Sequence, residues 1–143
     1  LSEIEKNHPY FISRLVNHPS IGFIIGIEGK IVKVISATGE VTITGNKAKF
    51  KGERFLQVYG DEKKLVKQIK TFANQKYSGD LIINGHFDGK KIVTFNHYQY
   101  GSHDSIGGDQ IDAFFMSKEK IDLSKVTNAK ELYHIFERYH KKK

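Results

Sequence analysis

Apolar residues near the start of the chain follow helical spacing. Residues 11–16 place apolar side chains on one face of a helix, and the turn-forming sequence Asn-His-Pro-Ser at 17–20 ends that helix. Upstream, Ser2 and Glu5 have the spacing of a capping box, which predicts that Ser2 begins a short first helix.

A block rich in Ile, Val and Phe follows and predicts β-strands. Segments 21–27 and 30–36 are separated by the pair Glu28-Gly29, which favours a tight turn. Segment 41–44 alternates between apolar and polar residues, as a half-buried strand does. The block therefore predicts an antiparallel meander with one face exposed to water.

The hydrophobic period changes again at Asp61, which has the position of a helix N-cap. The following residues predict an amphipathic helix that ends near 77–79 and carries lysines on its polar face. Its apolar positions are Leu65, Val66, Ile69, Phe72 and Ala73.

The second half of the chain predicts three more strands and a last helix. Segment 80–84 is a short apolar run of the kind that lies inside a sheet, and Asp88-Gly89 favours a hairpin into a strand at 91–95. A strand at 113–116 and an amphipathic helix from about Thr127 complete the pattern. These elements predict an α/β fold, a mixed sheet with a substantial antiparallel part, covered by amphipathic helices.

Composition is that of a soluble globular protein. The chain has 143 residues, of which 38% are hydrophobic and 27% charged, so we expect one domain over residues 1–143. No apolar run approaches the roughly 18 residues that span a bilayer, and the first residues are charged rather than those of a signal peptide. The missing initiator Met suggests a piece of a longer protein. Without cysteine, a metal would be bound by His, Asp, Glu, Ser or Thr.

The net charge of +7 leaves two interpretations open. It is typical of a solvated, lysine-rich surface, and it also attracts phosphate-bearing partners. Arginine is scarce, with only Arg14, Arg54 and Arg138, and arginine is favoured for bidentate recognition of phosphate and guanine. We therefore expect no specific nucleic-acid partner.

The segment 96–112 has little periodicity and is rich in glycine and in side chains that bind metals. Within it, His103 lies in a glycine-rich stretch, where a backbone free of Cβ atoms lets an imidazole approach an ion closely. His97 precedes it by six residues, a spacing that predicts nothing definite. Taken alone, a single histidine in such a loop favours a structural role over a metal ligand.

Three segments together change that interpretation. Residues 15–23 read Leu-Val-Asn-His-Pro-Ser-Ile-Gly-Phe, residues 80–89 read Asp-Leu-Ile-Ile-Asn-Gly-His-Phe-Asp-Gly, and residues 101–110 read Gly-Ser-His-Asp-Ser-Ile-Gly-Gly-Asp-Gln. Their succession resembles the C-terminal end of a bacterial branch of the alkaline phosphatase superfamily. That branch has an Asn-His-Pro-Gly-Ile-Gly-Phe segment, a similar strand with a Tyr-Asp-Gly turn, and a late His-Gly-Gly-Leu-Gly-Gly-Pro-Gln signature. The resemblance covers most of the chain.

The resemblance implies the C-terminal portion of an alkaline-phosphatase-like fold in a metal-dependent phosphatase or phosphodiesterase. Such enzymes hold two divalent ions with Asp and His residues and attack the substrate with a Thr or Ser. His103 matches the last histidine ligand, with Asp104 as an accessory, and the ions would be Zn or Mn in the complete protein. The candidate residues of the substrate cleft are Gly101, Ser102, Gly107, Gly108 and Gln110.

The chain departs from the signature at three positions. Asp104 and Ser105 stand where that branch has Gly-Gly, and Asp109 stands where it has Pro. The nucleophile and the remaining ligands of such enzymes lie upstream, and a zinc site needs three or four protein ligands. We therefore expect no catalytic residue in this chain, no tight metal binding and no activity without the rest of a parent polypeptide. That parent would act on a phosphoester substrate, and membrane anchoring of it stays open.

Two other interpretations stay open for particular residues. His18 fits a helix-terminating turn whose imidazole binds backbone carbonyls, and Asp88 fits a hairpin turn better than a catalytic acid. For the whole chain, the alternative function is a non-enzymatic basic module that keeps the fold and binds anionic partners, or one that only completes the sheet of a parent protein.

Overall fold

The computed structural model describes the chain except for residues 97, 99–104, 109–112, 127 and 141–143 and the side chains of 139 and 140. The chain divides into two compact units, Leu1–Asp112 and Ala113–Lys143, and each has its own description below. A single domain over 1–143 remains a prediction.

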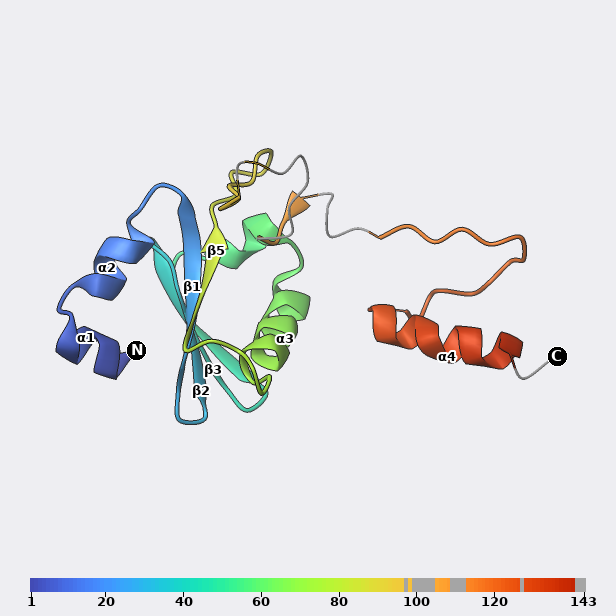
Figure 1. Ribbon diagram of the computed structural model, residues 1–143, viewed down its shortest axis with the longest axis horizontal. Helices are drawn as coiled ribbons and strands as arrows, with labels where there is room; N and C mark the ends of the chain where they lie inside the picture. The colour runs from blue at the N-terminus through green and yellow to red at the C-terminus, as the bar shows by residue number, and fades with distance from the viewer. Residues whose placement is uncertain (97, 99–104, 109–112, 127, 141–143) are drawn as a thin grey trace. The chain divides into compact units, whose positions relative to one another are not determined.

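An antiparallel sheet forms the centre of the first unit (Figure 1). Its five strands are β1 (Ile21–Glu28), β2 (Ile31–Ile35), β3 (Gly39–Thr44), β4 (Lys47–Gly52) and β5 (Leu81–Gly85). Their order across the sheet is β4-β3-β2-β1-β5, and each neighbouring pair is antiparallel. The mixed α/β class and the meander are confirmed, but the sheet is not mixed within the described strands.

The turns of the meander follow from glycine at positions that require a left-handed backbone. Gly29 has φ 60° and Gly45 has φ 56°, and residues that carry a Cβ atom rarely adopt this backbone conformation. The first turn consists of Gly29 and Lys30, one residue later than predicted. Strand β4 was not predicted, because only Ala48 and Phe50 carry its apolar alternation while lysines occupy the other face.

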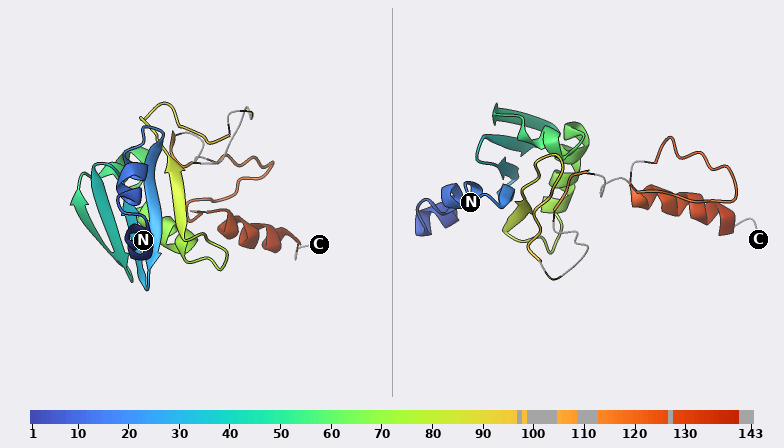
Figure 2. Two further views of the ribbon diagram at one scale, coloured as in Figure 1. Left: turned by 60° about the vertical axis from the view of Figure 1, so that its left-hand side comes forward. Right: turned by 90° about the horizontal axis from the view of Figure 1, so that it is seen from above.

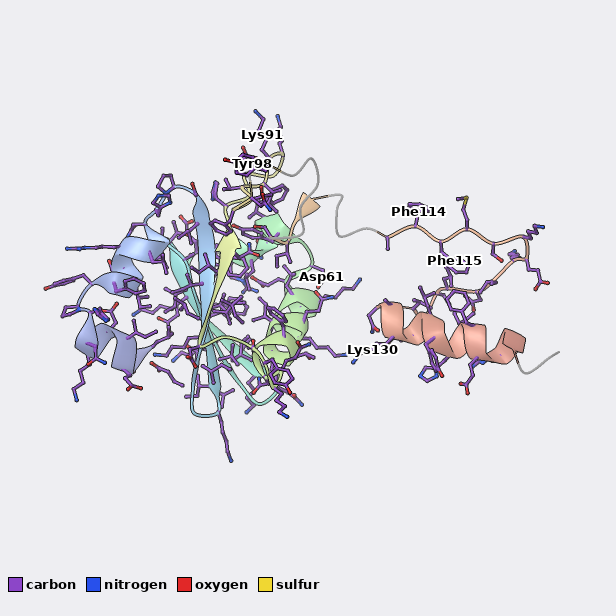
Figure 3. The ribbon with its side chains drawn as sticks, in the orientation of Figure 1. Asp61, Lys91, Tyr98, Phe114, Phe115 and Lys130 are labelled. Atoms are coloured by element: carbon purple, nitrogen blue, oxygen red, sulfur yellow. The ribbon has the colours of Figure 1, made fainter. Side chains whose placement is uncertain are left out.

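One face of the sheet is covered by α3 (Glu62–Ala73) and the preceding short 3-10 helix η1 (Phe55–Tyr59) (Figure 1, Figure 2). The predicted N-cap is confirmed, because the Asp61 side chain accepts a hydrogen bond from the Lys64 N–H at 2.9 Å. Figure 3 labels Asp61 at this end of the helix. The helix ends at Ala73, earlier than predicted, and Phe72 is 49% exposed instead of joining the core.

The helices α1 (Ser2–Asn7) and α2 (Phe11–Val16) cover the other face (Figure 1). Ile12 and Val16 pack there against the fully buried Ile24 of β1. The predicted first helix is confirmed as α1, but its capping box does not form. The Ser2 hydroxyl donates to Glu28, and the Glu5 carboxylate accepts from backbone N–H groups at the start of α2.

Strand β5 differs from its prediction in its place in the sheet. It is an edge strand paired only with β1 among the described strands, although its apolar run predicts an interior position. Leu81 of β5 packs in the same cluster as Val16 of α2, on one face of the sheet, and Ile82 packs in the core cluster on the α3 side. Both faces of β5 are therefore partly covered, which explains its apolar sequence. The predicted strand 91–95 is reduced to one bridge between Phe87 and Ile92.

The second unit contains α4 (Ala129–His140), which confirms the predicted last helix. The ring centroids of Phe115 and Phe136 lie 5.9 Å apart, so Phe115 packs against this helix (Figure 3). The predicted strand 113–116 is wrong, because those residues have no strand pairing. Among the described helices, none is long and apolar enough to cross a membrane.

Candidate functional site

Within the glycine-rich stretch 101–110, which carries the predicted site, the structure describes only residues 105–108. Gly101, Ser102, His103, Asp104 and Gln110 lie outside the described residues, as does His97. The described residues are Ser105, Ile106, Gly107 and Gly108. These four define how the segment meets the sheet.

Ser105 attaches the segment to the end of β5. Its hydroxyl accepts a hydrogen bond from the Gly85 N–H at 2.8 Å and donates one to the Val93 carbonyl at 3.0 Å. Ser105 is 8% exposed, so these bonds satisfy polar groups that have little access to water. A Cβ on Gly85 would lie 2.3 Å from the Ser105 Oγ and 1.9 Å from the Val93 carbonyl oxygen, so the contact requires glycine at 85.

The side chain of the neighbouring Asn84 forms a hydrogen bond with the same segment. Its Oδ1 accepts from the Ile106 N–H at 3.1 Å, and its Nδ2 donates to the Gly85 carbonyl at 3.0 Å. Asn84 is 7% exposed, and a buried amide of this kind fixes the backbone that it binds. The pattern of apolar residues gave no indication of this role, because Asn84 only marked the end of a predicted strand.

The two glycines that follow fit closely against an aromatic ring. Gly107 has φ 120° and Gly108 has φ 64°. A Cβ on Gly107 would lie 2.8 Å from the Phe87 ring, and one on Gly108 would lie 3.3 Å from it. The positive φ at both positions favours glycine. At Gly107 the Phe87 ring also leaves no space for a Cβ atom.

Phe87 is itself fixed by Tyr59 of η1. The two ring centroids are 5.9 Å apart, and the Phe87 N–H donates to the Tyr59 hydroxyl at 3.3 Å. Burial raises the pKa of Tyr59, so this group stays a neutral phenol at physiological pH. Tyr59 and Phe87 thus connect the hydrophobic core under α3 with Gly107 and Gly108 of the candidate site.

The turn at 17–20 lies at the same end of the sheet. The Ser20 carbonyl accepts from the His86 N–H at 2.9 Å, and Ile21 pairs with Gly85 in the sheet register. The His18 Nδ1 accepts from the Ser20 N–H at 3.2 Å, so its imidazole binds a backbone N–H rather than the expected carbonyls. His18 stabilises a turn.

Asp88 also has a structural role, as predicted. One oxygen of its side chain accepts from the Lys90 N–H at 2.8 Å and the Lys91 N–H at 2.7 Å. These backbone donors lower the pKa of Asp88, and Lys91 is exposed beside it (Figure 3). The carboxylate closes a turn, which agrees with the hairpin interpretation.

A hollow of about 370 Å³ adjoins this end of the sheet. Gly22, Tyr59 and His86 line it together with Ser36 and Arg54 from the far side. The Arg54 guanidinium pairs with Glu62 and lies 4.0 Å from the centroid of the Phe50 ring. The sequence did not predict that these residues line one hollow, because they come from separate elements that no local pattern connects.

Metal ligation is not observable in the described residues. No group of three or more His, Asp or Glu side chains placed to hold an ion occurs within that part of the chain. His103 and Asp104 lie outside it. The metal-ligand prediction for them therefore remains a prediction.

Comparison with known proteins adds no relative. No protein-family model matches the chain, and neither a curated protein nor a solved structure does. The resemblance to the alkaline phosphatase superfamily therefore depends on the three segments quoted from the sequence.

Proposed function

We propose that the chain is the C-terminal domain of a metal-dependent phosphoester hydrolase of the alkaline phosphatase type. In this proposal His103 is a ligand of one of two divalent ions, Zn or Mn, and Asp104 is an accessory ligand. The rest of the parent polypeptide supplies the nucleophile and the other ligands. Gly101, Ser102, Gly107, Gly108 and Gln110 contribute to the substrate cleft.

One observation supports this proposal most strongly: the three segments that carry the resemblance meet at one end of the sheet. Ser20 binds His86, Gly85 binds Ser105, and Asn84 binds Ile106, all through hydrogen bonds of 2.8 to 3.1 Å. Ser20 and His86 are 66 residues apart in the chain and Gly85 and Ser105 are 20 apart, so the fold brings together segments that are separate in the sequence. An active-site scaffold requires such a region, in which supporting contacts hold the residues of the site in place.

The anchoring bonds also account for one departure from the family signature. Ser105 stands where the family has glycine, and its hydroxyl is engaged by Gly85 and Val93. The serine therefore acts as a structural link beneath the segment. His103 precedes this link by two residues, a short enough connection for a fixed backbone at 105 to limit where the imidazole can lie.

The chemistry that the ions would supply is stabilisation of negative charge on the phosphoryl oxygens and a lower pKa for the nucleophile. The contribution of this chain is to position one imidazole and to form part of the cleft wall. The rigid support through Asn84, Ser105 and Phe87 serves that positioning.

The test uses the full polypeptide encoded with this segment and an aryl phosphodiester as substrate. His103→Ala is expected to lower kcat/KM by at least about 100-fold, because loss of a metal ligand exceeds the usual effect of an outer-shell change. The matched control is His134→Ala, an exposed histidine of α4. Full activity of His103→Ala, with His134→Ala also unaffected, would overturn the proposal.

A further inference from the structure

A second hollow, of about 630 Å³, lies at the opposite end of the sheet from the candidate site. Lys63, Lys67 and Lys70 of α3 line it together with Asn46 of the β3–β4 turn. The register places this turn far from Ser105, because Ile31 pairs with both Glu28 and Thr44 at one end while Gly85 pairs with Ile21 at the other.

The three lysines share one face of α3. Their spacing of four and then three residues puts successive lysine side chains one helical turn apart, with Cβ atoms separated by roughly 5–6 Å. Like charges at this spacing repel one another, so the helix face is disfavoured without a counter-charge. Lys70 is oriented toward the turn, with its Nζ 3.3 Å from the Asn46 Oδ1.

No carboxylate compensates these charges in the described part of the chain. The residues that line the hollow include no Asp or Glu, and none of the three ammonium groups has a carboxylate within 4.0 Å. Two other cationic side chains of the first unit do have such a partner: Lys33 lies 2.9 Å from Glu28, and Arg54 pairs with Glu62. The three α3 lysines thus line a concave surface that contains no acidic residue.

The residues that line the hollow exclude some classes of ligand. It contains no aromatic ring on which a nucleic-acid base could stack. Its apolar members, Ile43 and Val66, lie in a concavity and not on a protrusion that could enter a lipid surface. Lysines are compact point charges that bind phosphate without the planar geometry that arginine imposes.

We propose that this hollow binds a soluble anion that carries two or more phosphate groups a few ångströms apart. Successive ammonium groups of α3 each neutralise one phosphate, and the Asn46 amide adds a hydrogen bond to the ligand or to Lys70. The binding site is separate from the candidate site near Ser105, so it does not depend on the proposed hydrolase function.

The experiment titrates tripolyphosphate into the full chain by isothermal calorimetry at low and physiological salt. The triple variant Lys63→Gln/Lys67→Gln/Lys70→Gln is expected to weaken binding at least about tenfold, and higher salt to weaken wild-type binding. The matched control is Lys47→Gln/Lys49→Gln/Lys51→Gln. It removes the same charge from β4, on the sheet face away from the residues that pack under α3, and is expected to stay within about twofold.

Four results would contradict the proposal. Equal weakening by the two triple variants would mean that net charge alone attracts the anion. No binding at low salt would mean that the hollow is only a solvated surface. Binding of phosphatidylserine vesicles or a thymidine oligonucleotide through the α3 lysines, without binding of tripolyphosphate, would assign the surface to a membrane or a nucleic acid. His103→Ala should leave tripolyphosphate binding unchanged, and a loss there would also contradict a separate site.

Discussion

Ser105 shows at the scale of one residue how the candidate site is supported. Its hydroxyl joins the end of the glycine-rich segment to two backbone groups, one on β5 and one at Val93. The sequence identified Ser105 only as a departure from a family signature. Its structural role depends on groups 12 and 20 residues away, which no local pattern can reveal.

Replacing Ser105 tests this support. We expect Ser105→Ala to lower the free energy of unfolding by about 1–3 kcal/mol, because the buried Gly85 N–H loses its acceptor. Urea denaturation monitored by circular dichroism measures the change. The control Ser13→Ala alters an exposed helical serine and should stay within about 0.5 kcal/mol of the wild type. Equal stability of the two variants would contradict the assigned role.

Gly107 provides a test of packing against Phe87. We expect Gly107→Ala to destabilise the chain by more than Gly29→Ala, which costs about 1 kcal/mol for a Cβ at positive φ. Both glycines have positive φ, but a Cβ at 29 meets nothing within 4 Å whereas one at 107 would lie 2.8 Å from the ring. Thermal unfolding of both variants compares them. Indistinguishable melting temperatures would show that the ring moves aside without cost.

At the scale of elements, the predictable parts are those with a strong period. The apolar alternation of β2 and the stripe of α3 determine which face is buried, so sequence alone identifies both. Strand β4 and the edge position of β5 could not be predicted in this way. Strand β4 has lysine at every second position and only two apolar residues between them, so its apolar pattern is weak. The position of β5 at the edge of the sheet depends on the order of the strands, which its own residues do not encode.

The capping box predicted at Ser2 does not form for a similar reason, because the decisive contact comes from a residue far away in the sequence. A capping box is a local pattern, but Glu28 offers the Ser2 hydroxyl and N–H a charged acceptor 26 residues away. Charge-assisted hydrogen bonds are stronger than the neutral bond of an ordinary cap. Glu5 is then available for the start of α2, where it accepts from the Ile12 N–H. Long-range electrostatics therefore overrides the local preference.

Glu28 links α1 to the first hairpin and predicts a pH dependence. Lys33 at 2.9 Å and the Ser2 donors hold the pKa of Glu28 at about 2, below its ordinary value of 4.5. Because the folded state favours the carboxylate, its contribution is complete above about pH 4.5 and is lost as the pH falls toward 2. We expect this contribution to be about 1 kcal/mol, since solvent screens the partly exposed pair.

Urea denaturation between pH 7 and 2 measures that contribution. Glu28→Gln should be less stable than the wild type at pH 7, and the difference should shrink across the window below pH 4.5. Lys33→Met removes the largest cause of the lowered pKa and should reduce the same acid-dependent loss. A constant difference between wild type and Glu28→Gln at every pH would refute the linkage.

At the scale of the whole molecule, the fold class was predictable and the site was predictable only as a region. Glycine content and the resemblance identify Gly107 and Gly108 in the sequence, and the apolar pattern identifies the strand β5. The structure brings the end of β5 and the two glycines together through Asn84, Ser105 and Phe87. His103 and Asp104 lie outside the described residues, so the role proposed for them is based on the sequence alone. Under the proposed function, the chain contributes one part of a composite site.

A composite site predicts inactivity of the chain by itself. We expect no turnover of an aryl phosphate with added Zn²⁺ or Mn²⁺, because one histidine and one aspartate are too few ligands to hold a catalytic ion. A colorimetric assay with each metal in excess measures this. Turnover that His103→Ala abolishes would show instead that the chain contains a complete site.

The most direct measurement of the central claim is the metal content of the full polypeptide encoded with this segment. We predict two divalent ions per chain in the wild type and the loss of one of them in His103→Ala, with His134→Ala unchanged, as measured by inductively coupled plasma mass spectrometry after dialysis. Two ions retained in His103→Ala, or none in the wild type after reconstitution with Zn²⁺ and Mn²⁺, would contradict the account.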